Sequence, residues 1–467
     1  MKVSLKKFCL LCVNFAMLLI EIITLLKVWN IQSISIKWSQ YAFWFSIINL
    51  LVNGITMYRL KVKISDFRLM FMLLTYLFMF GRVWLNYLSL DTEIYWVLQK
   101  QFSVISLCRT SVFCCCCIQA LFIGLFFSVK VINENVERNF IENPLEKSNI
   151  VYSTGIILLT IAIPCRLITD FYAIATTASS GNYNTIASQT GLADDFANLL
   201  IPAVLCIMVS RPRLTNKIML VVAAYYVMIM SMTGDRRYYT AGLLALGAFY
   251  LSSRKKKGKI KPFSMVSLII IAVLLLNFLE ILQQARLGNL GGVGSFFSEY
   301  SADLFVFDDL LYDVLSEFGI SFYSIVAMTD YIPKMMNYQF GLTFLRMIPS
   351  VLPIGFLLGD MFELASPSNI VNNFTGLPLG ATAFGDLYAN FGLFAIPASF
   401  FMGVIINLIG NQSNKVNSQM FTVIYYTSYY IMINLIRCAI FEFYRSIIWT
   451  TCIPLLVYMF YSKRKNS

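Results

Sequence analysis

The stretch RKKKGKIK at 254–261 lies between two apolar segments, 238–252 and 263–283. Apolar segments of roughly 17–25 residues can cross a hydrocarbon core that is about 30 Å thick. A cluster of Lys and Arg in a short loop beside such segments is typical of the cytoplasmic side of a membrane protein. This stretch therefore predicts two membrane-spanning helices that are joined by a basic cytoplasmic loop.

The composition of the whole chain agrees with this interpretation. Of the 467 residues, 58% are hydrophobic and 13% are charged, and the mean hydropathy is +0.71. No soluble domain has this balance, and in lipid only helices satisfy the backbone of such segments. We predict an all-α, polytopic integral membrane protein with about 12 transmembrane helices, in which residues 1–467 form a single transmembrane domain. The expected spans are 8–28, 41–58, 67–88, 103–129, 151–175, 196–210, 218–232, 238–252, 263–283, 384–410, 419–436 and 446–461.

The loops between the spans predict the orientation of the chain. If the N-terminus is cytoplasmic, the basic loops 59–66, 211–217 and 253–262 and the basic C-terminal tail all lie inside. Both termini are then cytoplasmic. The net charge of +12 reflects this topology and does not indicate a nucleic-acid partner.

One large extracytoplasmic loop is expected at 284–383, between spans nine and ten. A loop of that length is rarely without a function. It contains apolar pieces at 318–328 and 342–358 that are too short or too interrupted by proline to span. We interpret these pieces as interfacial or re-entrant helices.

Cysteine and histidine usage limits the chemistry. The chain has 11 cysteines, nearly all of them within apolar spans, and no histidine. This distribution predicts no disulfide framework. Four consecutive cysteines, Cys114–Cys117, cannot face one ion from a helix, and we interpret them as small apolar packing residues. We expect no metal, no cofactor and no histidine-based acid–base catalysis.

The arginines depart from the pattern of the lysines. Of 36 Lys and Arg residues, 23 lie on the predicted inner side, and 16 of these are Lys. The other 13 lie outside or in the outer parts of spans, and nine of them are Arg. Because Arg binds phosphate bidentately, this distribution predicts an outward-facing site for an anionic, diphosphate-bearing, lipid-linked substrate. The nine are Arg82, Arg109, Arg166, Arg236, Arg237, Arg286, Arg346, Arg437 and Arg445.

Six of these arginines are candidate substrate-binding residues, because they lie in outer loops or at outer span ends. They are Arg236, Arg237, Arg286, Arg346, Arg437 and Arg445. The tandem pair begins a predicted helix, where free N–H groups and the positive dipole end favour an anion. The alternative for these residues is a local ion pair, with Asp235 for the tandem pair and with Glu442 for the last two. Arg166 lies within a span, four residues before Asp170, which is its expected structural partner.

Carboxylates and tyrosines on the outer side supply the remaining candidates. A carboxylate that is half-buried near apolar residues suits the role of a general base. The candidates are Asp313, Glu317, Asp386 and Glu442, and the sequence does not choose among them. Tyrosines in or beside the large loop suit either the membrane interface or stacking on sugar rings, and Tyr388 is the candidate for substrate binding.

Four stretches occur in an order and spacing that carry a family resemblance. They are TGDRRYYTAGLLAL at 233–246, SEFGISFYSIVAMTDYIP at 316–333, YQFGLTFLRMIPSVLP at 338–353 and GATAFGDLYANFGLFAIPASFFMG at 380–403. The last contains a Gly-acidic-x-Tyr-x-Asn-Phe-Gly signature. Together they resemble the bacterial O-antigen and capsule repeat-unit polymerases of the Wzy type, over roughly 230–410. In that family the large loop is extracytoplasmic and its arginines are implicated in catalysis.

The resemblance implies an enzyme, a glycosyltransferase that joins undecaprenyl-diphosphate-linked repeat units into O-antigen or capsular polysaccharide. The reaction is expected on the outer face of the bacterial cytoplasmic (inner) membrane. A sugar hydroxyl of the acceptor attacks the anomeric carbon of the donor, and undecaprenyl diphosphate leaves. Glu317, Asp386 or Glu442 is the expected base. The implied partners are the lipid-linked glycan substrates, membrane lipid and, as a candidate, a chain-length regulator protein.

Two alternatives belong to other functional classes, a lipid-linked glycan flippase or transporter and an O-antigen ligase. Twelve spans with both ends inside also suit a transporter. Such carriers commonly have two similar halves, whereas the halves of this chain look dissimilar. Ligases related to the polymerases use a histidine, which this chain lacks.

Overall fold

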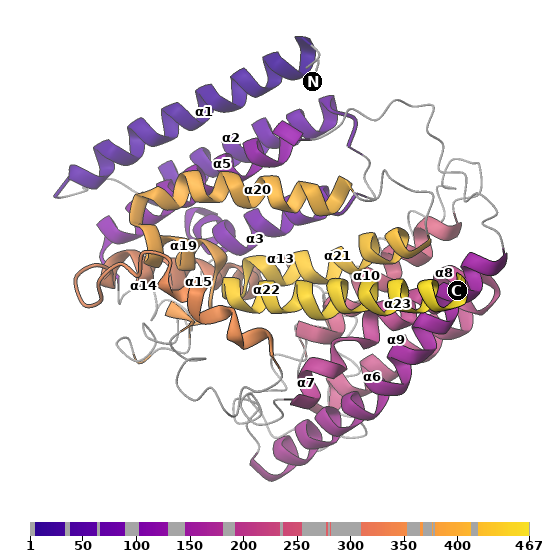
Figure 1. The fold of residues 1–467 in the computed structure, drawn as a ribbon. Coiled ribbons are helices and arrows are strands. Elements are labelled where there is room, and N and C mark those ends of the chain that lie inside the picture. The colour runs from indigo at the N-terminus through magenta and orange to yellow at the C-terminus, as the bar shows by residue number, and fades with distance from the viewer. Residues whose placement is uncertain are drawn as a thin grey trace.

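The computed structural model describes most of the chain. Its described residues are 5–32, 38–62, 66–88, 102–128, 145–180, 192–233, 237–254, 277–278, 281, 310–352, 365–367, 376, 379–411 and 419–466. Within these ranges the chain is helical and contains no strand, which confirms the all-α prediction (Figure 1). Nine helices in this part of the chain are long and apolar enough to cross a membrane. The protein is therefore a polytopic membrane protein.

Every predicted span except the ninth coincides with helix. The ninth, 263–283, lies outside the described residues apart from 277–278 and 281, so the number of twelve stays a prediction. The helices that cover the other spans are α1 (Leu5–Asn30), α2 (Trp38–Arg59), α3 (Phe67–Leu88), α5 (Val104–Ser128), α6 (Leu145–Ser180), α7 (Leu192–Ala197), α8 (Leu200–Ser210), α9 (Thr215–Thr233), α10 (Arg237–Arg254), α19 (Ala383–Phe391), α20 (Ala395–Asn411), α21 (Gln419–Ile436), α22 (Ile440–Ile447) and α23 (Ile453–Asn466).

The described part of the predicted outer loop forms short helices. They are α13 (Leu310–Gly319), α14 (Ser321–Tyr331), α15 (Leu342–Met347) and the 3-10 turn η4 (Pro349–Val351). α14 is buried from Ser321 to Met328 and packs against α5 and α19. This apolar piece is thus part of the helix bundle and does not lie on its surface.

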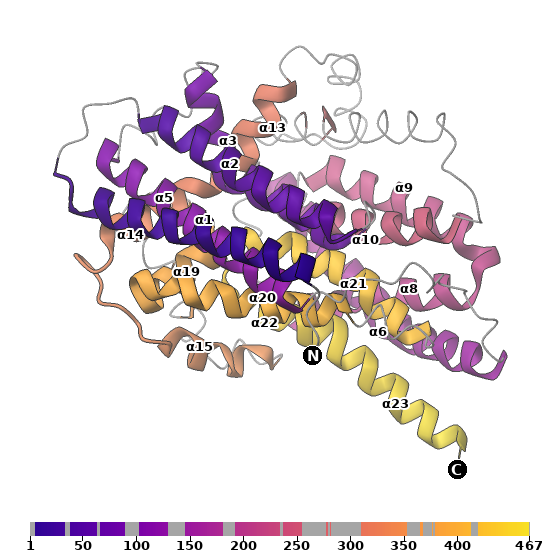
Figure 2. The ribbon, with the colours of Figure 1, turned by 90° about the horizontal axis from the view of Figure 1, so that it is seen from above.

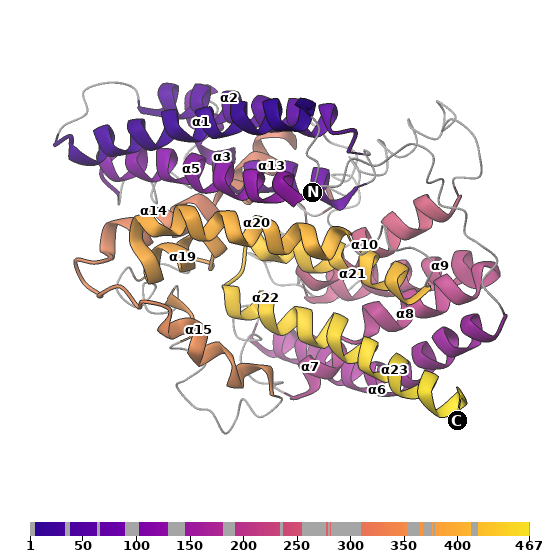
Figure 3. The same cartoon turned by 45° about the horizontal axis from the view of Figure 1, so that its top comes forward.

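α5 is the helix around which its neighbours are arranged. Of its most apolar 18-residue window, 94% is buried. α1, α2, α14 and α20 all pack on it, and α1, α5 and α20 run side by side in Figures 1 and 3. Its four consecutive cysteines, Cys114–Cys117, are buried in these contacts as free thiols. Their small side chains fill the core of the bundle.

The backbones of α5 and α20 approach each other closely. A Cβ atom at Gly124 of α5 would overlap the carbonyl oxygen of Phe400, and one at Gly403 of α20 would overlap that of Leu121. Helix backbones approach this closely in membranes only where small residues line both sides. The position of α20, and of α19 at its N-terminal end, therefore depends on these two glycines.

A buried polar network joins α1, α2, α3 and α5. The Asn53 amide donates hydrogen bonds to Tyr76 Oη (2.8 Å) and to Gln119 Oε1 (2.9 Å). The Asn49 amide donates to Glu21, and both side chains are fully buried. Polar side chains inside a membrane bundle hold helices together when they find partners on neighbouring helices. This network fixes the order of the N-terminal helices.

A second group of helices contains α6, α8, α9, α10 and α21 (Figure 2). Arg166 of α6 forms an ion pair with Asp170, 2.5 Å away, as the spacing predicted. The Tyr239 hydroxyl donates to the same carboxylate at 2.6 Å. The guanidinium of Arg166 also lies 4.0 Å from the ring centroid of Tyr238. These contacts balance the intramembrane charge of Arg166, which therefore has a structural role.

The glycine contact between α5 and α20 generates the first prediction. We expect Gly403→Leu to destabilise the protein by about 1–3 kcal/mol or more, because the added side chain must push the two backbones apart. The measurement is the thermal unfolding midpoint of the purified protein in detergent. Gly247→Ala in α10 is the matched control, since no atom lies within 4 Å of a Cβ built there. This control is expected to gain about 0.4–1 kcal/mol. Equal midpoints for Gly403→Leu and the control would contradict the close contact.

Candidate functional site

The site is built on α19, whose sequence AFGDLYANF is buried at nearly every position. Thr382 caps the N-terminus of the helix, because its side-chain oxygen accepts a hydrogen bond from the Gly385 amide at 3.1 Å. Thr, Ser, Asp and Asn are favoured at this position for that reason. α19 leads through a single 3-10 turn, Gly392–Phe394, into α20. The glycine contact of α20 with α5 therefore also fixes α19.

Asn390, near the C-terminal end of α19, binds the segment that carries α15. Its Oδ1 atom accepts hydrogen bonds from the Gly341 amide and the Thr343 hydroxyl, both at 3.0 Å. The backbone amides of Gln339 and Phe340 donate to carbonyl oxygens of α19. Asn390 thus connects two of the stretches that the sequence singled out, 338–353 and 380–403.

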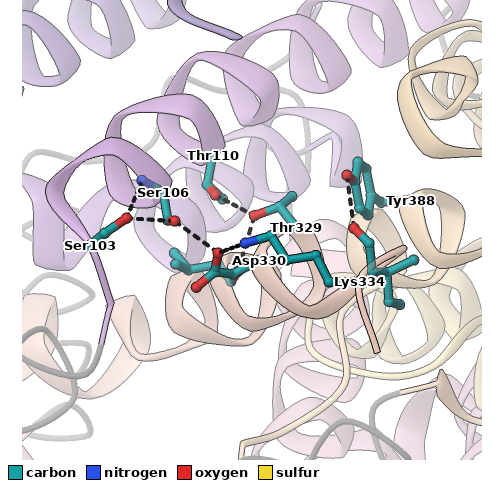
Figure 4. A network of polar contacts seen from close by, with 9 residues as sticks. Ser103, Ser106, Thr110, Thr329, Asp330, Lys334 and Tyr388 are labelled. Atoms are coloured by element: carbon teal, nitrogen blue, oxygen red, sulfur yellow. Dashed lines mark hydrogen bonds and ion pairs between the residues drawn. The ribbon is translucent and has the colours of Figure 1, made fainter. Parts of the chain in front are cut away.

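A polar network attaches the end of α14 to the start of α5 (Figure 4). The Asp330 carboxylate accepts hydrogen bonds from Ser106 Oγ at 3.1 Å and from Lys334 Nζ at 2.8 Å. The Thr110 and Thr329 hydroxyl groups lie 2.6 Å apart. This network fixes another of the four stretches, 316–333, against α5. The hydrogen bond from Tyr388 to the Ile332 carbonyl places the same stretch beside α19.

Asp386 connects α19 to α22. Its Oδ2 atom accepts a hydrogen bond of 2.7 Å from the backbone amide of Ile440, the first residue of α22. A carboxylate at a helix N-terminus satisfies an amide that has no partner within the helix and interacts favourably with the helix dipole. The Oδ1 atom of Asp386 is buried and has no hydrogen-bond partner among the described residues. Glu442, in the first turn of α22, is close enough for its charge to act on Asp386.

Arg445, one turn further along α22, forms an ion pair with Asp195 of α7. The Asp195 side chain is 1% exposed and that of Arg445 is 22% exposed, so part of the arginine side chain reaches the surface. Asp195 was not among the predicted site residues, and the alternative ion pair expected for Arg445 was with Glu442. The available signal was the tandem Asp194-Asp195 at the end of a polar outer loop, but no periodicity relates it to a residue 250 positions away.

α15 lies against α22, so that Arg346 and Arg445 come from neighbouring elements. The Trp449 indole holds this arrangement, because its Nε1 donates to the Val351 carbonyl at 3.0 Å. Its ring also makes an edge contact with Phe196 of α7, with centroids 5.0 Å apart. Trp449 lies in a π-helical turn, Ile448–Cys452, directly after α22. Such turns occur frequently at functional sites.

The start of α10 lies close to the same elements. α10 begins at Arg237, and the hydroxyl of the next residue, Tyr238, donates to the Ala197 carbonyl of α7 at 3.2 Å. Tyr430 of α21 donates to Asn198 Oδ1 at 3.0 Å, directly after α7. The start of α10 therefore lies beside the helix that carries Asp195.

Four of the predicted residues, Asp386, Glu442, Arg445 and Arg346, lie on α22 or on elements that contact it. With Asp195 they form what we call the α22 cluster. Arg437 lies three residues before α22, with its guanidinium carbon 5.4 Å from the Phe78 ring centroid.

The remaining predicted residues either lie in the protein core or are outside the described part of the structure. Tyr388 is 1% exposed, donates its hydroxyl to the Ile332 carbonyl at 3.3 Å and contacts three other aromatic rings. Its described contacts are all within the protein core. Arg236 and Arg286 lie outside the described residues, as do the side chains of Arg237, Asp313 and Glu317.

Two of the span arginines bind backbone carbonyls. Arg82 is buried and donates from Nε to the Ser316 carbonyl of α13 at 2.9 Å. Arg109 donates to the Ile31 carbonyl at 2.9 Å. Among the described residues, no group of three or more His, Cys, Asp or Glu side chains has the arrangement of a metal site.

Comparison with known proteins identifies the family. The chain matches the family described as O-antigen polysaccharide polymerase Wzy over residues 10–466, nearly its whole length, and it belongs to that family. It is accordingly a membrane glycosyltransferase that forms polysaccharide from lipid-linked repeat units, and the flippase and ligase alternatives are not favoured. No curated protein and no solved structure matches this chain.

The contacts of Asn390 generate the second prediction. Asn390→Leu leaves the Gly341 amide and the Asp386 carbonyl without their side-chain partner, so we expect a loss of about 1–3 kcal/mol of stability. The segment 338–352 should detach from α19 first and become sensitive to limited proteolysis. The exposed Asn337 provides the matched control, because Asn337→Leu changes the same residue type next to this segment. If both variants are cleaved at the same rate, Asn390 does not hold the segment.

Proposed function

We propose that the α22 cluster is the place where this polymerase binds the diphosphate of its lipid-linked donor and transfers the glycan. The observation that carries the proposal is the arrangement around α22, where Arg346, Arg445, Asp386 and Glu442 come together from segments that are distant in sequence. The reaction requires both the cationic and the carboxylate side chains. Cations stabilise the negative charge that grows on the leaving diphosphate, and a weak base accepts a proton from the attacking hydroxyl.

In the proposed reaction, a sugar hydroxyl of one repeat unit attacks the anomeric carbon of the glycan on undecaprenyl diphosphate. A new carbon–oxygen bond forms, and the bond from the anomeric carbon to the diphosphate oxygen breaks. The electron pair of that bond leaves with undecaprenyl diphosphate. The proton of the hydroxyl passes to a carboxylate of the α22 cluster.

Arg445 and Arg346 are the proposed diphosphate ligands. The guanidinium of Arg445 is held by the buried Asp195 while part of the arginine side chain is exposed, which suits a group that must be oriented before the substrate arrives. Arg346 is half-buried in the last turn of α15, next to α22. Two planar guanidinium groups on adjacent elements suit bidentate contacts to a diphosphate.

Of the two carboxylates, we assign the proton transfer to Glu442 and a positioning role to Asp386. Glu442 is half-exposed on α22, whereas Asp386 is 2% exposed and already binds the helix N-terminus. A bulky sugar hydroxyl reaches an accessible carboxylate more readily than a buried one. Asp386 then acts through α22, whose direction sets where Glu442 and Arg445 point.

We also propose that the chain lies in the bacterial cytoplasmic membrane with both termini in the cytoplasm and the loop 284–383 outside. The support is the concentration of lysines in one set of loops. A chain-length regulator is a proposed partner, supported by the family relationship alone.

The third prediction separates the two carboxylates. In cells that lack the chromosomal gene, Glu442→Gln is expected to lower polymer formation by about 10²–10⁴-fold, because the base is lost. Asp386→Ala should also fail, since α22 loses its N-terminal partner. Asp386→Asn should restore polymer, because an amide oxygen can still accept from the Ile440 amide. The measurement is the size distribution of the surface glycan, with protein level checked by immunoblot. If Glu442→Gln polymerises while Asp386→Asn does not, Asp386 is the base.

The fourth prediction concerns the arginines. Arg445→Ala and Arg346→Ala are each expected to abolish long chains, with a loss on the order of 10²–10³-fold in rate. Both proteins should remain in the membrane. Arg445→Lys keeps the charge but not the planar fork and should be intermediate. Lys334→Gln is the control for the loss of a positive charge, because this exposed lysine binds Asp330 and is not part of the α22 cluster. Normal chain length in both alanine variants would remove the arginines from the site.

A further inference from the structure

α6, α8 and α9 enclose an apolar groove that the polymerase reaction does not use. Its cavity volume is about 470 Å³, within the range of roughly 300–1,000 Å³ that is usual for ligand sites. Apolar side chains from all three helices line it, among them Leu159 and Ile163 of α6, Val204 of α8 and Val222 of α9. All three helices are candidate membrane spans or parts of one. The groove therefore lies at the depth of lipid chains.

One end of the groove is basic. Lys217, in the first turn of α9, belongs to the lining. Arg213, four residues earlier in the 3-10 turn Pro212–Leu214 (η2), is exposed, as is Lys217. Neither cation forms an ion pair within the part of the chain that the structure describes. Both charges are thus available to a ligand at the end of the groove where α8 is connected to α9.

The third cation of the groove differs from these two. Arg166 lies in the lining, but it is paired with Asp170 and with Tyr239. Its charge is balanced inside the protein. The groove is therefore apolar along its length and carries unbalanced positive charge only at the Lys217 end.

We propose that this groove is a binding site for an anionic phospholipid, with an acyl chain between α6, α8 and α9 and the phosphate at Lys217 and Arg213. A basic pocket between membrane helices is the arrangement that recognises acidic lipid headgroups. The acyl chain of the lipid is surrounded by hydrocarbon both before and after it binds. The groove therefore contributes to binding through its shape and its packing against the acyl chain. The two cations then decide which headgroup is retained.

The occupant is a phospholipid and not the polyprenyl tail of the substrate, because the groove and the α22 cluster lie on different helices. α22 contacts α15 and α21, whereas the groove is formed by α6, α8 and α9. Lys217 and Arg213 both belong to the basic loop 211–217, which the proposed topology places on the side of the membrane opposite to the transfer reaction.

Native mass spectrometry of the full-length protein in detergent tests the proposal. The probes are phosphatidylglycerol and phosphatidylcholine of equal chain length, supplied at equal concentration. We expect one phosphatidylglycerol to be retained in preference to phosphatidylcholine. Removal of one cation, by Lys217→Gln or Arg213→Gln, should reduce that preference about fivefold, and the double variant should lose it. Lys463→Gln, at an exposed position in α23, is the control for the loss of a positive charge.

A second pair of variants tests the groove itself. Val222→Trp fills the groove and should abolish retention of the lipid. Leu220→Trp places the same side chain on the same helix at a position that is 73% exposed and not part of the lining, so retention should persist. Equal retention of the two lipids by the unaltered protein, or retention unchanged in the double variant, would overturn the proposal. Displacement of phosphatidylglycerol by an equal concentration of undecaprenyl phosphate would overturn it in favour of a site for the substrate tail.

Discussion

The contact of Gly124 and Gly403 with the backbone of the facing helix is the constraint on which the rest of the arrangement depends. Lipid offers no hydrophobic force between helices, so close packing and interhelical hydrogen bonds must hold them. A Cβ atom at either glycine would overlap a carbonyl oxygen of the other helix. This contact joins α20 to α5, a helix that is buried along most of its length. Because α19 precedes α20 after one short turn, it also fixes the helix that binds both α15 and α22.

The need to satisfy polar groups inside the membrane divides the arginines into two groups. A charge inside the bundle is costly and must find a partner. Arg166 has Asp170, and Arg82 and Arg109 bind backbone carbonyls, so these three contribute to structure. Arg346 and Arg445 lie instead where α7, α15 and α22 meet, with part of each side chain exposed. Their place on α22 and on α15 beside it, and not their mere presence on the predicted outer side, separates the proposed ligands from the structural cations.

The sequence could predict those parts of the fold that depend on local pattern. Apolar length located every described span, and the spacing of Arg166 and Asp170 predicted their ion pair. The signature around Asn390 indicated the family, but only the structure shows that this side chain holds the segment 338–353. The pair of Asp195 and Arg445 could not be predicted, because contacts between distant helices follow from packing and leave no periodic signal. Nearly all of the ninth span and about half of the large loop lie outside the described residues, so those predictions remain untested.

The described positive and negative side chains around α22 are equal in number, so we expect the α22 cluster to need further cations to hold a diphosphate. Around α22 the described cations are Arg346, Arg437 and Arg445, and the described carboxylates are Asp195, Asp386 and Glu442. In their ionised forms, these six side chains carry charges that sum to zero. A diphosphate adds negative charge in a setting where water is partly excluded, so it requires positive charge beyond this balance. The remaining arginines of the sequence prediction are Arg236, Arg237 and Arg286. Tyr238 holds the start of α10 against α7, the helix that carries Asp195, so the backbone of Arg237, the first residue of α10, lies near the same helix.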